Sequence, residues 1–574
     1  MTKKIKEIRF YLLITALCMT VNLHPLLAQE LNKVRAKKGV VSLAKPINRS
    51  TATSDTKPKL VVGIVVDQMR YDYLTRFWNH YGEGGFKRLV NDGFNCRNNH
   101  FNYIPTYTGP GHASVYTGTT PAYHGIVGNN WFDKLAAGMV YCAGDDDYNS
   151  VGCSSTAGKM SPSRLMSSTV TDELRMATQL RGKVIGIALK DRGAILPAGH
   201  AANAAFWFEG MNEGKWISSD YYMKTLPDWV TAFNKSGKIK AYLKTWNTLK
   251  PIETYVESGP DNTEFESPFM GEKAPVFPHD LKKFSKDNDG YDIIKSSPFG
   301  NSMTLDFALE ALKAEELGKD SITDFLAISF SSTDYVGHKF GVNSKEVQDT
   351  YLRLDLELER LLTALDESVG QGAYTVFLTA DHGAVNVPAY LKSLKIPAEY
   401  VDTRAYATTI SENLEKSFGV KDLILKVYND QIFIDHEKAA QAGLNTERVM
   451  DEIVRMVEKF DGVMGVYTRK QMITENYTQP LLAKLQRGYN FQRSGDIIFV
   501  LHPATTSYMR TGSTHGTGFS YDTHVPLLFY GYGINSGSTV RRTEITDIAP
   551  TISSLLGISF PNAAIGNPIE EVLD

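Results

Sequence analysis

The sequence predicts an α/β protein built on a mostly parallel β-sheet that is flanked by helices. Four continuous apolar runs, rich in β-branched residues, have the composition of strands that are buried on both faces. Helical patterns lie between these runs, and strands that alternate with helices are typical of parallel sheets. Each run also ends in ionisable residues, and in open α/β sheets ligands bind at the carboxyl ends of the strands. The observations that predict the fold therefore also indicate where its site lies.

The four predicted strands span residues 60–66, 183–189, 324–330 and 374–380. The ionisable residues that follow them are, in chain order, Asp67; Lys190, Asp191 and Arg192; Asp334 and His338; and Asp381 and His382. A single Asp at the end of a strand is as often the cap of the next helix as a ligand. Four such strand ends favour a common site.

Three further elements complete the predicted sheet domain. Residues 345–365 repeat apolar side chains at helical spacing and predict a long amphipathic helix. A last strand, residues 525–530, follows the Gly-rich loop 512–518, in which His515 is the lone histidine. A helix over residues 547–556 closes the pattern.

Two stretches interrupt the alternation of strands and helices. Residues from about 201 to 298 are rich in Trp, Tyr, Gly and Pro and show no clean periodicity. Residues from about 387 to 510 contain patterns that predict a small strand-helix-strand subdomain. We expect both stretches to be insertions that cover the active-site edge of one catalytic domain, which spans residues 59–574.

The first 28 residues have the order of a secretory signal peptide. A basic start precedes an apolar run at 10–21, and small and apolar residues lead up to Ala28, after which we place the cleavage. Residues 29–58 are basic and polar, and we expect a flexible leader there. No later run approaches the ~20 apolar residues of a membrane helix. We therefore predict a protein that is exported, to the periplasm or beyond.

Composition excludes one class of function and limits the cysteine chemistry. The 574 residues include 61 basic and 64 acidic side chains, a net charge of −3, so the basic surface of a nucleic-acid-binding protein is not expected.

Cys96, Cys142 and Cys153 remain after the predicted cleavage, and an oxidising compartment would allow one disulfide and one leftover thiol. Their scattered positions disfavour a zinc site built on cysteines.

The stretch 105–118 is where we predict the chemistry. It sets the hydroxyl of Thr108 directly before the breaker cluster 109–111, which we expect to forbid a regular element at that point. A helix that starts at His112 would aim its unpaired N–H groups back towards Thr108, and helix starts attract anions such as phosphate. Taken alone, the same breakers equally describe a surface turn.

Three carboxylates and three imidazoles at strand ends or in Gly-rich loops form a possible ligand set: Asp67, Asp334, Asp381, His338, His382 and His515. Such a mixture of oxygen and nitrogen donors suits Zn²⁺ and is large enough for two ions. Two metals a few ångströms apart can hold the attacking and the leaving oxygen of a phosphoryl transfer, and a metal lowers the pKa of a hydroxyl that it binds. We assign that hydroxyl to Thr108.

At these residues the sequence resembles the alkaline phosphatase superfamily, and most closely its alkaline phosphatases with a threonine nucleophile and a Lys/Arg pair. The resemblance spans nearly the whole predicted mature chain. It implies that Thr108 is the nucleophile and a metal ligand, that one zinc is bound by Asp67, Asp381 and His382, and that the other is bound by Asp334, His338 and His515. It further implies that Asn129, Lys190 and Arg192 bind the phosphate group.

The implied activity is the hydrolysis of small phosphate monoesters through a phosphothreonine, with two Zn²⁺ ions as cofactors. Positive charge around the transferring group, from the metals and from Lys190 and Arg192, is the main catalytic effect in such transfers. We expect a monomer that has no nucleic-acid partner.

Other functions stay open at this point. A nucleotide pyrophosphatase/phosphodiesterase has a similar nucleophile motif and similar zinc ligands, and the Lys190/Arg192 pair is the feature that distinguishes a monoesterase from it. A non-catalytic, zinc-stabilised surface protein would keep the ligands and lose the nucleophile, whereas Thr108 is present. A sulfatase is disfavoured, because its nucleophile lies in a Cys-x-Pro-x-Arg context and the residues from 108 to 112 contain neither Cys nor Arg.

Overall fold

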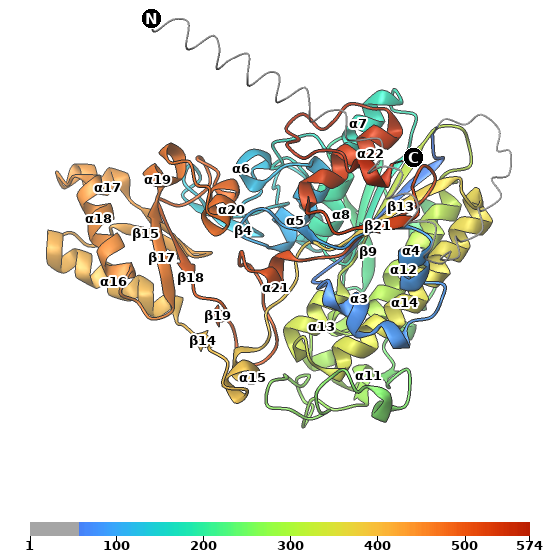
Figure 1. Cartoon of the computed structure of the whole chain (residues 1–574), viewed down its shortest axis with the longest axis horizontal. Helices are drawn as coiled ribbons and strands as arrows, with labels where there is room; N and C mark the ends of the chain where they lie inside the picture. Colours follow the sequence, from blue (N-terminus) through green and yellow to red (C-terminus); the bar gives the residue numbers. More distant parts are fainter. Residues whose placement is uncertain (1–56, 574) are drawn as a thin grey trace, which may run out of the picture. The chain divides into compact units, whose positions relative to one another are not determined.

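The computed structural model describes residues 57–573. The predicted signal peptide, and all but the end of the predicted leader, lie outside the described residues. The fold is built on a ten-stranded sheet in the order β21-β2-β20-β13-β1-β12-β7-β8-β9-β6, with helices on both of its faces (Figure 1). The predicted α/β class is confirmed.

The centre of the sheet is parallel. Its five strands are β13 (Tyr374–Thr379), β1 (Leu60–Val66), β12 (Asp324–Phe330), β7 (Val184–Ala188) and β8 (Ala204–Glu209). The register pairs Val66 of β1 with Phe330 of β12, and β1 ends level with β13 as well. Asp67 and the residues that follow β12 and β13 therefore leave the sheet side by side.

Antiparallel pairing enters at both edges of the sheet. The strands on one side are β20 (Leu527–Gly531), β2 (Phe94–Cys96) and β21 (Gly537–Thr539), and those on the other side are β9 (Lys215–Ser219) and β6 (Ser150–Val151). Strand β20 runs antiparallel to β13, and β9 runs antiparallel to β8. The sheet is therefore mixed, and parallel only in its centre.

Strands β8 and β9 lie in the stretch 201–298, so the start of this predicted insertion belongs to the main sheet.

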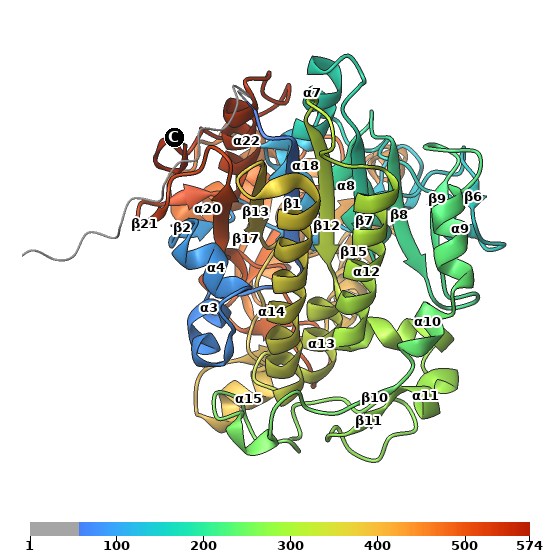
Figure 2. The same cartoon turned by 90° about the vertical axis from the view of Figure 1, so that its right-hand side faces the viewer.

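Helices cover the two faces of the sheet. One face carries α12 (Pro298–Ala314) and α14 (Lys345–Leu365), which lie in front of the sheet in Figure 2. The other face carries α5 (Thr108–Thr117), α7 (Val170–Ala177), α8 (Asp191–Ala198) and α22 (Ile548–Leu556). The bounds of α14 agree with the predicted helix, because Leu354, Leu358 and Leu361 repeat at helical spacing and are fully buried.

The stretch 387–510 forms a second sheet in the order β15-β16-β18-β17, drawn in orange in Figure 1. Its strands are β15 (Ile424–Tyr428), β16 (Gln431–Ile434), β17 (Val463–Thr468) and β18 (Ile497–Leu501), and its helices include α16 (Thr403–Phe418) and α18 (Thr446–Val457). Alternate residues of β18 are buried on opposite faces: Phe499 packs with α16 and α18, and Ile498 packs with Ile104 of the main domain. The sheet is therefore covered on both faces.

Helix α5 begins earlier than we predicted. It starts at Thr108 and runs through Pro110 and Gly111, because Pro110 lies in the first turn, where a backbone N–H would have no partner within the helix. Gly111 lets the helix approach the site: a Cβ atom there would lie 2.3 Å from the carbonyl oxygen of Asp381. The breaker cluster thus forms the start of a helix and does not interrupt one.

The three cysteines of the described residues are free thiols. The disulfide that an oxidising compartment would allow is not formed: Cys96 lies in the main core, whereas Cys142 lies in a separate core beneath α5 and α8, and Cys153 packs against that second core as a free thiol. Among residues 57–573, no helix is both long enough and apolar enough to cross a membrane.

Candidate active site

Six of the seven predicted metal ligands, all except Thr108, lie at the carboxyl edge of the central strands and in the loop before β20, and they form two groups. Within each group the ligand atoms lie within 4.8 Å of one another. The first group is Asp67, Asp381 and His382, and the second group is Asp334, His338 and His515. This division is the one that the family resemblance implies.

The first group is buried completely and has the spacing of a metal site. Nε2 of His382 lies 3.5 Å from Oδ1 of Asp67 and 3.6 Å from Oδ2 of Asp381. A tetrahedral zinc with bonds of about 2.0–2.2 Å separates its ligand atoms by about 3.3–3.6 Å. His382 donates its Nδ1–H to the carbonyl of Gly383 at 3.0 Å, which leaves the Nε2 lone pair free.

Three buried atoms of this group have no hydrogen-bond partner within residues 57–573, namely Oδ1 of Asp67, Oδ2 of Asp381 and Nε2 of His382. Buried polar atoms without a partner are rare in folded proteins and need an explanation. A cation bound between these three atoms, one from each residue of the group, would satisfy all of them, so the residues present fit a metal ion.

The second group has similar spacing but consists of one carboxylate and two imidazoles. Oδ1 of Asp334 lies 3.2 Å from Nε2 of His338 and 3.7 Å from Nε2 of His515. Each imidazole donates its Nδ1–H to a backbone carbonyl, that of Ser513 for His338 at 2.8 Å and that of Thr106 for His515 at 2.7 Å. Both Nε2 atoms are therefore directed at the carboxylate. In metal sites, hydrogen bonds from the other ring nitrogen usually orient the histidine ligands in this way.

The charges at the site favour a cation. Burial, together with the charges of Asp334 and Asp381, raises the pKa of Asp67 well above its usual value. Burial lowers the pKa of His382, and burial together with the charge of His382 lowers the pKa of His515. The imidazoles of His382 and His515 are thus held in the neutral form that coordinates metals, and a divalent cation would relieve the repulsion among the carboxylates.

Lys190 connects the two groups. Its ammonium lies 2.7 Å from Oδ2 of Asp67 and 2.5 Å from Oδ2 of Asp334, and its side chain is buried. It therefore neutralises one oxygen of each carboxylate and leaves the other oxygen, Oδ1, directed at the histidines. Lys190 is the residue before α8, where the end of β7 brings it to the active-site edge.

Arg192 and Asn129 are each held by one contact that leaves donors free. Nη1 of Arg192 donates to the hydroxyl of Tyr141 at 3.0 Å, the same hydroxyl donates to Asp191, and Nε of Arg192 is buried without a partner among the described residues. Oδ1 of Asn129 accepts a hydrogen bond of 2.7 Å from the N–H of Gly109 in the first turn of α5. The amide NH₂ of Asn129 remains available to a ligand near Thr108.

Thr108 is buried at the first position of α5, and His112 joins this turn to the first group. Nδ1 of His112 lies 2.9 Å from the carbonyl oxygen of Thr108 and 3.2 Å from Oδ2 of Asp381, and its Nε2 lies 2.9 Å from Oγ of Ser329. The position of Thr108 is therefore fixed relative to Asp381.

Two residues that hold the site together, Gln68 and His112, were not predicted from the sequence. Gln68 has a left-handed backbone (φ 65°), donates its N–H to Asp381 at 3.1 Å and donates its Nε2–H to Oδ1 of Asp334 at 2.7 Å, so it contacts both groups. Its only signal in the sequence is its place beside Asp67. His112 belongs to the stretch that carries Thr108, but its residue type did not reveal its partners.

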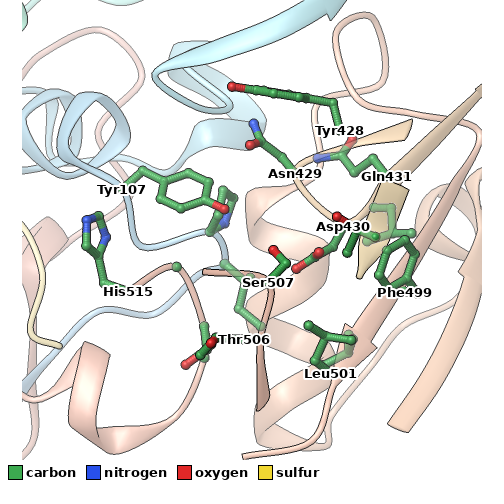
Figure 3. Close-up of a pocket in the computed structure, with 18 of the residues that line it drawn as sticks. Tyr107, Tyr428, Asn429, Asp430, Gln431, Phe499, Leu501, Thr506, Ser507 and His515 are labelled. Atoms are coloured by element: carbon green, nitrogen blue, oxygen red, sulfur yellow. The ribbon is translucent and has the colours of Figure 1, made fainter. Parts of the chain in front are cut away.

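A cavity of about 590 Å³ adjoins the site on one side. His515 and Tyr107 lie on one wall, and residues of β15, β16 and β18 lie on the other (Figure 3). Neither Thr108 nor the other five predicted metal ligands line this cavity. The cavity therefore meets the site only beside the second group.

Comparison with known proteins identifies the family. The model of the type I phosphodiesterase/nucleotide pyrophosphatase family matches residues 61–525. The chain is 47% identical to a protein of Myroides odoratus named calcium-transporting ATPase, over 90% of this chain and 95% of that protein. It is 43% identical to alkaline phosphatase PafA of Elizabethkingia meningoseptica, over 93% of this chain and 98% of that protein, and 45% identical to alkaline phosphatase PhoV of Synechococcus elongatus, over 90% and 93%.

The fold agrees with these matches. The crystal structure of alkaline phosphatase PafA superposes with a TM-score of 0.87 at 43% identity, over 90% of this chain and 99% of that chain. The protein therefore belongs to the type I phosphodiesterase/nucleotide pyrophosphatase family and is an enzyme of the alkaline phosphatase type.

Proposed function

We propose that the protein is an exported, zinc-dependent alkaline phosphatase that hydrolyses small phosphate monoesters through a phosphothreonine at Thr108. The observation that carries this proposal is the position of Thr108: it begins a helix whose first turn His112 joins to the first ligand group. The names of the relatives PafA and PhoV support the same activity.

Asp67, Asp381 and His382 would hold one zinc ion, and Asp334, His338 and His515 would hold the second, with Thr108 beside them. The donor types, the free Nε2 atoms and the ligand spacing support this assignment. When bound, two such ions lower the pKa of a nucleophilic hydroxyl and stabilise the negative charge on the leaving oxygen.

The first step forms a bond between the hydroxyl oxygen of Thr108 and phosphorus while the bond from phosphorus to the alcohol oxygen breaks, and the alcohol takes up a proton. Water then attacks the phosphothreonine, releases phosphate and restores the threonine hydroxyl. The start of α5 supports both steps, because its dipole favours negative charge near Thr108.

Arg192, Lys190 and Asn129 are the proposed ligands of the phosphoryl oxygens. A monoester dianion has three free oxygens, whereas a diester monoanion has two, so an additional cation favours the monoester. Arg192 is the cleaner test of this preference, because Lys190 also neutralises Asp67 and Asp334. The name of the family leaves diester hydrolysis as the second candidate function.

Thr108→Ala should abolish the phosphoenzyme and lower kcat/KM for a monoester by several orders of magnitude, because the nucleophile is lost. The measurement is acid quenching with a ³²P-labelled monoester, followed by mapping of the label. Thr106→Ala is the control: the hydroxyl of Thr106 already donates to the carbonyl of Thr517 at 2.9 Å, so this variant should still be labelled. Label on Thr106 in the wild type would show that the nucleophile is wrongly assigned.

Arg192→Ala should lower kcat/KM for a monoester by about 100-fold and change the rate for a diester by much less, since two charge-assisted hydrogen bonds to the phosphoryl group are lost. Arg181→Ala, at an exposed position, serves as the matched control. Equal losses on the two substrates would contradict a role in monoester selection and would favour the diesterase.

Gln68→Ala should weaken zinc binding by about 10- to 100-fold, because Gln68 orients ligands of both groups. The quantity to measure is zinc retained per chain during competition with a chelator. Gln179→Ala is the matched control, because Gln179 is exposed and its backbone is also left-handed (φ 55°). This variant makes the same change of residue in the same backbone conformation, away from the site. Unchanged zinc retention in Gln68→Ala would rule out this positioning role.

A further inference from the structure

The cavity beside the second ligand group has the size and position of a subsite. Its volume of about 590 Å³ lies within the range of about 300–1,000 Å³ that is typical of small-molecule sites. It meets the active site at His515 and at Tyr107, the residue before Thr108. In Figure 3, Tyr107 and His515 face Asp430, Phe499 and Leu501 across the cavity.

The proposed reaction directs the alcohol of the ester towards this cavity. An in-line displacement places the leaving oxygen on the side of phosphorus that is opposite the nucleophile. His112 joins Thr108 to the first ligand group, whereas the cavity opens beside His515 of the second group. The alcohol therefore extends past the second group and into the cavity.

Asp430 is the unusual residue of the cavity wall. It lies in the two-residue turn between β15 and β16 in a left-handed conformation (φ 55°). Two contacts hold the turn: the N–H of Phe499 donates to the carbonyl of Asp430 at 2.9 Å, and Nδ2 of Asn429 donates to the carbonyl of Asn130 at 2.9 Å. The Asp430 carboxylate itself has no hydrogen-bond or ionic partner in the part of the chain that the structure describes.

Burial without a partner is costly for a charged carboxylate, and it raises the pKa of Asp430 to about 7. A ligand that donates hydrogen bonds to the carboxylate would remove this cost. Two kinds of donor are possible, the ammonium group of an amino alcohol and the hydroxyl groups of a polyol. The remaining wall of the cavity decides between them.

The other lining residues favour a neutral polyol. Arg404 and Lys426 also line the cavity, and their charges oppose a cationic ligand. The wall further offers polar groups that both donate and accept, together with aromatic faces for an apolar ring surface, from Gln431, Thr506, Ser507, Tyr107, Tyr428 and Phe499. A sugar ring presents hydroxyl groups at its edge and C–H groups on its faces, and so matches this mixture.

We propose that this cavity is the alcohol subsite of the phosphatase, and that Asp430 selects esters of polyhydroxylated alcohols, namely sugar phosphates, by accepting hydrogen bonds from their hydroxyl groups. The inference rests on the proposed function, because it assigns a substrate class to the same site.

The test compares a hexose 6-phosphate with ethyl phosphate, in the wild type and in Asp430→Asn. Asn tolerates the left-handed turn, and a melting-temperature measurement checks that the variant is folded. The ratio of kcat/KM for the hexose phosphate to kcat/KM for ethyl phosphate should fall about tenfold. Asp422→Asn is the matched control, because Asp422 is exposed and also left-handed (φ 53°), and its ratio should equal that of the wild type.

A second measurement reports binding without turnover. Calorimetry on Thr108→Ala should detect the hexose phosphate, and adding Asp430→Asn should weaken that binding by about tenfold. An unchanged ratio and unchanged affinity in Asp430→Asn would overturn the subsite. Phosphoethanolamine is assayed alongside these esters. A loss of activity in Asp430→Asn that is confined to phosphoethanolamine would also overturn the subsite, because it would assign the carboxylate to an ammonium group. If the wild type hydrolyses neither ester, the proposed function itself fails, and the two failures are thereby distinguished.

Discussion

The structure depends on three buried carboxylates that meet at the ends of neighbouring parallel strands. Asp67, Asp334 and Asp381 are placed together because β1, β12 and β13 end at the same level. Like charges in a buried site repel strongly unless cations and hydrogen-bond donors compensate them. The ammonium of Lys190 and the amide of Gln68 supply part of that compensation, and the ligand spacing suits metal ions, which would supply the rest.

The same constraint connects the chemistry to the rest of the fold. Helix α5 can approach the carboxylates closely because Gly111 has no side chain, and this approach sets Thr108 beside the first group. The loop that carries His515 is held by the hydrogen bond from His515 to the carbonyl of Thr106. His515 also lines the cavity beside the second sheet. The proposed nucleophile, Thr108, and the proposed alcohol subsite thus lie next to different ligand groups. A displacement in which the nucleophile enters and the alcohol departs on opposite sides of phosphorus requires this arrangement.

Much of this could be predicted from the sequence, because buried strands and the ionisable residues at their ends are local patterns. The α/β class, helix α14 and the strand ends that carry Asp67, Asp381 and His382 needed only such patterns. Features that depend on tertiary context were not predictable. The left-handed Gln68 that joins both groups, the inclusion of Pro110 in a helix and the antiparallel edge strands follow from contacts between distant segments. The Asn429-Asp430 turn, which separates β15 from β16 and forms part of the cavity wall, was likewise not predicted.

The central claim is that the two ligand groups each hold a zinc ion, and anomalous X-ray scattering tests it most directly. Crystals of the purified protein would be measured just above and just below the zinc absorption edge. If each group holds a zinc ion, two anomalous peaks that vanish below the edge are expected, one among Asp67, Asp381 and His382 and one among Asp334, His338 and His515. The absence of a zinc peak from either group in zinc-loaded crystals would contradict it.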